Sequence, residues 1–139
     1  MCILIGSIGG IVSIYFLGAL YRWSGSWFGG QATSEEVRAA IAWASVPTLL
    51  IFPIWVFELL IFGEEMFTSL TPRIDANPML AFVMLIFLAI EIALGVWAFV
   101  VLVKSLGEVH RFSAWKALAG IITGSLAIAL PLFCILLIL

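Results

Sequence analysis

The run MLAFVMLIFLAIEIALGVWAFVVLV, residues 79–103, contains one ionisable residue, Glu91, and ends directly before Lys104. A helix rises about 1.5 Å per residue, so this run exceeds the roughly 20 residues that cross the hydrocarbon of a bilayer. In lipid only helices and closed barrels satisfy every backbone polar group, and an unbroken apolar run of this length is typical of a helix. Residues 79–103 are therefore predicted to form a transmembrane helix.

Three more apolar segments accompany this run, at about 1–20, 41–62 and 114–139. The composition agrees with them, because 65% of the 139 residues are hydrophobic and only 10% are charged, and the mean hydropathy is +1.29. A soluble domain carries about 25% charged residues. We therefore expect an all-α fold: a polytopic transmembrane bundle of about four spanning helices with short interfacial helices, forming a single domain over residues 1–139.

Local signals predict how the second span begins. Thr33 followed by Glu36 is a capping-box pattern, in which a hydroxyl caps the helix and a glutamate bonds back to it. This helix is expected to start outside the hydrocarbon and lead into the second span. Pro47 and Pro53 lie inside that span and are expected to kink it, since proline removes a backbone donor.

The third helix is expected to begin at Asn77-Pro78, with asparagine as the cap and proline in the first turn. Beyond its end, residues 104–113 place apolar side chains at a spacing of three, which indicates a short amphipathic stretch at the membrane interface. Ser113 is expected to cap the last helix. The polar and aromatic residues of this predicted interfacial loop are Glu108, His110, Arg111, Trp115 and Lys116.

Basic residues predict the orientation of the bundle. Arg73 alone lies in the loop between the second and third spans, whereas five basic residues lie on the opposite side, namely Arg22, Arg38, Lys104, Arg111 and Lys116. The positive-inside rule then places connectors 21–40 and 104–116 in the cytoplasm and the C-terminus outward. The net charge of −2 provides no basic footprint for nucleic acid, so that class of partner is excluded.

Two connectors resemble a known family. GGQ at residues 29–31, followed by a capped helix with Trp43 and Pro47, resembles the bacterial branch of the Ypt-interacting protein (Yip) family, as does GEVHRFSAWKA at residues 107–117. The resemblance implies a membrane protein of the bacterial cytoplasmic membrane with an outward C-terminus. Family members usually have five spans, so this chain resembles one that lacks the first. It also lacks the Asp-Leu-Tyr-Gly-Pro type of stretch found in eukaryotic relatives that bind Rab GTPases, so Rab binding is not carried over.

Glu91 is the most unusual residue in the sequence, because helix rise puts it near the middle of its span. A charged carboxylate there costs about 2.5–3.5 kcal/mol on insertion scales, so we expect it to be neutral and to face protein or water. Ser13 and Ser125 are expected at a similar depth, as hydrogen-bond partners. Two interpretations remain open: a proton or ion relay, or a neutral glutamate that bonds between helices or to a partner subunit.

Two other ionisable residues, Glu58 and His110, are candidate sites. Glu58 lies near the outward end of its span and is expected to reach toward water or Arg73. Helix rise separates it from Glu91 by about 10 Å in depth, too far for a catalytic carboxylate pair. His110 is the only histidine, and a metal site needs three or four ligands. We expect it to be solvated at the interface, and the sequence indicates no metal, no cofactor and no catalytic residues.

Glycine pairs indicate helix packing. Gly6 with Gly10, and Gly120 with Gly124, match the small-xxx-small pattern that lets membrane helices approach closely, within the bundle or against a partner. The sequence therefore favours a non-catalytic scaffold or accessory subunit that binds the lipid bilayer and other membrane proteins. A small transporter or channel subunit that uses Glu91, a membrane-shaping protein, and a homo-oligomer remain alternatives.

Overall fold

The computed structural model describes residues 2–138, and in these residues every regular element is a helix. The predicted all-α fold is confirmed. The longer helices are α1 (Cys2–Trp27), α2 (Ser34–Ala44), α3 (Ile51–Phe62), α5 (Pro78–His110) and α6 (Ala114–Ile138). The shorter ones are α4 (Pro72–Ala76) and the two 3₁₀-helices η1 (Pro47–Leu50) and η2 (Gly63–Phe67).

The chain forms two compact units. One consists of residues 1–44 and 100–139, and the other of residues 45–99. The first unit therefore contains α1, α2, α6 and the last part of α5, whereas the second contains η1, α3, η2, α4 and the first part of α5.

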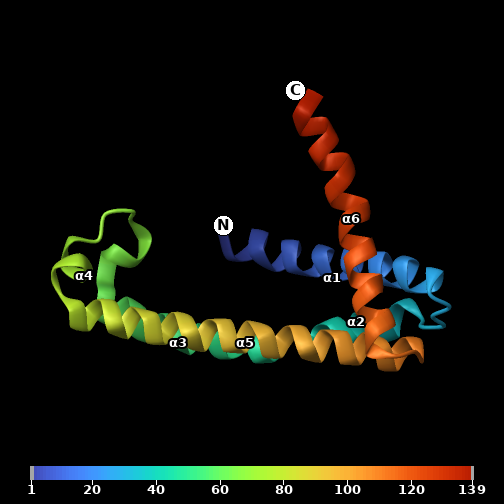
Figure 1. The fold of residues 1–139 in the computed structure, drawn as a ribbon, viewed down its shortest axis with the longest axis horizontal. Coiled ribbons are helices and arrows are strands. Elements are labelled where there is room, and N and C mark those ends of the chain that lie inside the picture. Colours follow the sequence, from blue (N-terminus) through green and yellow to red (C-terminus); the bar gives the residue numbers. More distant parts are fainter. Residues whose placement is uncertain (1, 139) are drawn as a thin grey trace. The chain divides into compact units, whose positions relative to one another are not determined.

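In the first unit, α1 packs against both α2 and α6, and α6 crosses α1 (Figure 1). A small apolar core lies where these helices meet the end of α5. Val37 of α2 and Leu106 of α5 are its most buried large side chains. The other buried members are small or β-branched residues of the α1–α2 connector, α2 and α6, namely Ala32, Ala40, Ile41, Ala117 and Ile121.

Glycine allows α1 and α6 to lie close together. A Cβ atom on Gly120 would lie 3.9 Å from the backbone of Gly25, and one on Gly124 would lie 3.1 Å from Oγ of Ser24. In contrast, no atom lies within 4 Å of where a Cβ would sit on Gly6 or Gly10. Gly120 and Gly124 therefore form a helix contact within the unit, whereas Gly6 and Gly10 lie on an open face of α1.

The predicted caps at Thr33 and Asn77 are present, but among the described residues the Ser113 hydroxyl makes no hydrogen bond that caps the last helix, so that prediction is wrong. Thr33 Oγ1 accepts a hydrogen bond from the backbone N–H of Glu36 at 3.3 Å, and the Glu36 carboxylate accepts one from the backbone N–H of Thr33 at 2.8 Å. Asn77 Oδ1 accepts a hydrogen bond from the backbone N–H of Met79 at 3.0 Å. Both caps satisfy donors that the first turn of a helix leaves unpaired.

The second unit begins where the helical path breaks. After α2 ends at Ala44, 3₁₀-type hydrogen bonds lead through Pro47 into η1 and then α3. At Pro47 the interruption is thus a change of helix type. Pro53 is the third residue of α3, where the N–H it lacks needs no helical partner.

Helix α3 and the first part of α5 lie side by side in this second unit (Figure 1). The rings of Phe62 and Phe87 pack edge to face with centroids 6.2 Å apart. Residues 104–110, predicted to form a short amphipathic stretch at the interface, continue α5 without interruption. The reason is that the amphipathic spacing of those residues is itself helical and no breaker follows Lys104.

Three segments of the described residues are long and apolar enough to cross a membrane: Ser34–Phe67, Pro78–His110 and Ala114–Pro131. This is an integral membrane protein. The expected span at 1–20 falls mainly in α1, which is not among the three, and its first residue, Met1, lies outside the described residues. A fourth span therefore stays a prediction.

Substituting glycine on the two faces tests the α1–α6 contact. We expect Gly124→Leu to destabilise the protein by about 1–3 kcal/mol, the usual cost of overpacking, because the new side chain must enter the space of Ser24. Gly10→Leu is the matched control on the open face and is expected to leave stability within about 0.5 kcal/mol. Unfolding in detergent, followed by circular dichroism, measures both. Equal losses would contradict the packing described for α1 and α6.

Candidate functional site

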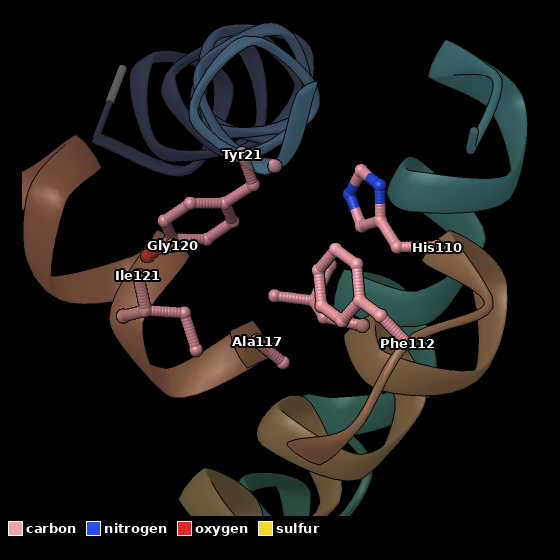
Figure 2. Close-up of a pocket in the computed structure, with 8 residues that line it drawn as sticks. Tyr21, His110, Phe112, Ala117, Gly120 and Ile121 are labelled. Carbon is pink, nitrogen blue, oxygen red and sulfur yellow. The ribbon is translucent and has the colours of Figure 1, made fainter. Parts of the chain in front are cut away.

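His110, the last residue of α5, lies in the interior of the first unit. Only 3% of its surface is exposed. Its imidazole stacks on the ring of Phe112 with the centroids 5.0 Å apart and the planes 6° from parallel. Figure 2 shows Tyr21 from α1 and these two rings converging on Ala117, Gly120 and Ile121 of α6. A cavity of about 10 Å³ remains between them, which is close to the smallest volume that holds one water molecule.

Two glycines cover the imidazole from the other side. A Cβ atom on Gly25 would overlap with Cε1 of His110, and one on Gly30 would overlap with its Nδ1. The loop between α1 and α2 is anchored there by two backbone hydrogen bonds. The N–H of Gly30 donates to the carbonyl of Gly25 at 3.0 Å, and the N–H of Gln31 donates to the carbonyl of His110 at 3.5 Å.

A sharp turn after α5 brings Phe112 over the histidine. Arg111 has a φ of 57°, which places it in the left-handed region as the residue that ends the helix. The N–H of Phe112 then bonds to the carbonyl of Gly107 at 3.0 Å, and that of Arg111 to Glu108 at 3.0 Å. Glycine at position 107 suits this turn, because a Cβ would lie only 3.2 Å from the carbonyl oxygen of Phe112.

The two nitrogen atoms of the His110 imidazole, Nδ1 and Nε2, lack hydrogen-bond partners among the described residues. Burying a charge without a partner is far more costly than burying a neutral polar group. This environment therefore favours the uncharged form of the ring. Our expectation of a solvated histidine is wrong, and the reason is the pair of glycines, which lets the loop close over it.

A second polar cluster lies in the second unit, along α3 and α5. The indole N–H of Trp55 donates a hydrogen bond of 2.6 Å to Oε1 of Glu91. Both residues line a groove of about 420 Å³, together with Glu58. Its apolar lining includes Phe62, Met66, Ile74, Met84 and Leu88, and its polar rim at the η2–α4 turn consists of Glu65, Thr68 and Thr71.

Glu58 is the most buried carboxylate of the described chain, with 8% of its surface exposed. It lines the same groove as Glu91. Among the described residues, no hydrogen bond or ion pair to its carboxylate occurs, and Arg73 does not pair with it. The expectation that Glu58 reaches toward water is therefore wrong, because the η2–α4 turn folds over this end of α3.

Glu65 explains how that turn is held. Its two carboxylate oxygens accept the backbone N–H groups of Arg73 at 3.0 Å and Ile74 at 3.2 Å. These donors belong to the first turn of α4, where an acceptor is needed and a negative charge is favoured. Sequence reasoning missed both Glu65 and Trp55, although Trp55 and Glu58 share a helix face at a spacing of three.

The remaining candidate residues lie outside these two clusters. The Ser13 hydroxyl donates to the carbonyl of Gly10 within α1 at 2.8 Å, and Ser125 is exposed on α6. Trp55 rather than a serine is thus the partner found for Glu91. In the predicted interfacial loop, Trp115 is 80% exposed, and the exposed polar residues are Glu108, Arg111 and Lys116.

Comparison with known proteins bears on the His110 cluster, since its two halves are the connectors that carry the family resemblance. A family model described as the Yip1 domain matches residues 1–136. The chain belongs to the Yip1 domain family. No curated protein and no solved structure matches it. In this Yip1 domain, Gly30 of the first connector and His110 of the second pack directly against each other.

A double-mutant cycle tests the packing of His110 in this Yip1 domain. We expect Gly25→Ala to destabilise the protein by about 1–3 kcal/mol, because its methyl group overlaps with the imidazole. In the Gly25→Ala, His110→Ala double variant, the ring is gone, so the combined loss should fall below the sum of the single losses by about 0.5–3 kcal/mol. Detergent unfolding supplies all values, and Gly9→Ala, which meets no neighbour, is the control. Additive losses would rule out the contact.

Proposed function

We propose that this Yip1-domain protein is a non-catalytic scaffold or accessory subunit of a larger membrane protein assembly. One observation carries the proposal: the most apolar 18-residue window of Pro78–His110 has no buried residue within the chain. The corresponding windows of Ser34–Phe67 and Ala114–Pro131 are only 17% and 22% buried. Most of the apolar helix surface is therefore available to lipid or to other membrane proteins.

The distribution of packing supports a role in binding other proteins. The buried core is small and lies where α1, α2, α6 and the end of α5 meet, so the remaining helix lengths have little of the chain to pack against. Between membrane helices, association depends on close packing and interhelical hydrogen bonds, because lipid is as apolar as the side chains. The open Gly6/Gly10 face of α1 offers such a close approach to a partner helix.

Native co-purification tests the proposal. The protein is tagged at its chromosomal locus, extracted in mild detergent, and its companions are quantified by mass spectrometry. We expect a membrane protein recovered at fixed stoichiometry. A Gly6→Leu, Gly10→Leu variant should lose that companion while the protein remains folded, because these side chains enter open space in the chain itself.

The matched control is Gly9→Leu, which also meets no atom within 4 Å but points about 100° away from Gly10 around the helix. It should retain the companion. Recovery of the wild-type protein alone, or only as a homo-oligomer, would refute the accessory-subunit proposal.

We further propose that connectors 21–40 and 104–116 face the cytoplasm of a bacterial cell and that the C-terminus faces outward. The 5-to-1 distribution of Lys and Arg supports this orientation. Trp23, Trp27, Trp43 and Trp115 are all exposed on these connectors or beside them, and tryptophan is enriched at the membrane–water interface.

Cysteine labelling tests this orientation. In a background with Cys2→Ser and Cys134→Ser, we expect Ser69→Cys to react with a membrane-impermeant maleimide in intact cells, because residue 69 is exposed in the loop proposed to face outward. Glu108→Cys, exposed on the opposite connector, should react only after permeabilisation. The reverse pattern would invert the proposed orientation.

A further inference from the structure

Among the described residues of the second unit, none pairs with the Glu58 carboxylate by a hydrogen bond or an ion pair. Only 8% of the surface of the residue is exposed, and it lines the groove between α3 and α5. Burying a carboxylate without a partner is costly. The neighbouring Glu91 adds a second acid, and Trp55 satisfies only its Oε1 oxygen.

The groove has the size and lining of a small-molecule site. Its volume of about 420 Å³ falls within the roughly 300–1,000 Å³ of ligand pockets, which are mostly apolar with a few polar groups. Phe62, Met84 and Leu88 form apolar walls, and Trp55 contributes an aromatic ring beside the carboxylates. A bound cation gains from both carboxylates and from an aromatic face.

We propose that this groove binds a lipophilic monovalent organic cation. Its apolar body lies against Phe62, Met84 and Leu88, and its positive centre lies between Glu58 and Glu91. An organic anion is excluded because both acids would repel it. A bare Mg²⁺ or Ca²⁺ ion is also disfavoured, because these ions require six or more oxygen ligands, whereas the walls of the groove are apolar.

A lipid headgroup is a poorer occupant than a free cation. Glu91 lies thirteen residues beyond Pro78 in α5, which corresponds to roughly 20 Å of helix rise. A headgroup ammonium held at the membrane surface does not reach that depth. A free cation can instead enter past the polar rim of Glu65, Thr68 and Thr71.

Equilibrium binding of radiolabelled tetraphenylphosphonium to the full-length protein in phosphatidylcholine nanodiscs tests the proposal. We expect saturable binding above that of empty nanodiscs. Tetraphenylborate, an anion of the same shape, should show none, which separates charge recognition from partition into lipid. Absence of saturable phosphonium binding, or equal binding of the borate, would overturn the proposal.

Variants locate the site. Glu58→Gln and Glu91→Gln should each weaken phosphonium binding by about ten-fold or more, as expected from the loss of one strong charge contact. Glu58→Asp retains the charge and should retain most of the affinity, so the site remains testable if a Gln variant fails to fold. Trp55→Phe should weaken binding by a smaller factor, since it removes only the donor that positions Glu91.

Glu64→Gln is the matched control, because Glu64 is an exposed carboxylate of η2 outside the groove lining. It should bind like the wild type. A loss with Glu64→Gln as large as that with Glu58→Gln would contradict the assignment, because binding would then follow net charge alone. Selective retention of an ammonium lipid that Glu58→Gln abolishes, without phosphonium binding, would also overturn it and make lipid the occupant.

Discussion

Close backbone approach at glycine is the interaction on which the first unit depends. In a bilayer the surrounding lipid is as apolar as leucine or valine, so apolar side chains provide little drive for one helix to associate with another. Dispersion contacts at short range and hydrogen bonds must supply it instead. Gly120 and Gly124 bring α6 against Ser24 and Gly25 of α1, and the core around Val37 and Leu106 then has a wall to pack against.

The same close approach explains why a histidine can be buried at this position. An imidazole with both nitrogens unsatisfied is costly in an apolar site, and only continuous contact on both ring faces offsets that cost. Phe112 supplies one face by stacking, and Gly25 and Gly30 supply the other because they have no side chains. The two connectors that carry the family resemblance thus form one structural cluster, although about eighty residues separate them in the chain.

The features that could be predicted from the sequence are mainly those that depend on residues close together in the chain. The caps at Thr33 and Asn77 use residues two or three positions away, and the helical runs follow from length and composition. The burial of His110 could not be derived in this way, because it depends on glycines in a distant loop. The Trp55–Glu91 hydrogen bond likewise joins residues 36 positions apart on two helices. The burial of Glu58 was also out of reach, because it depends on the η2–α4 turn that folds over the end of α3.

Glu91 and Glu58, the two acids in the groove of the second unit, differ in their hydrogen-bond partners. Glu91 accepts a hydrogen bond of 2.6 Å from the indole of Trp55, and an interhelical hydrogen bond of this kind is sufficient reason for a glutamate at this position. That hydrogen bond leaves Glu58 without an explanation, because that residue is more buried and bonds to no described residue. Replacing a buried charged group by a well-packed apolar residue is often neutral or stabilising, so stability alone does not require an acid at this position. A single lipophilic cation bound in the groove would explain why two carboxylates lie there. It would also explain why apolar side chains line the groove beside them.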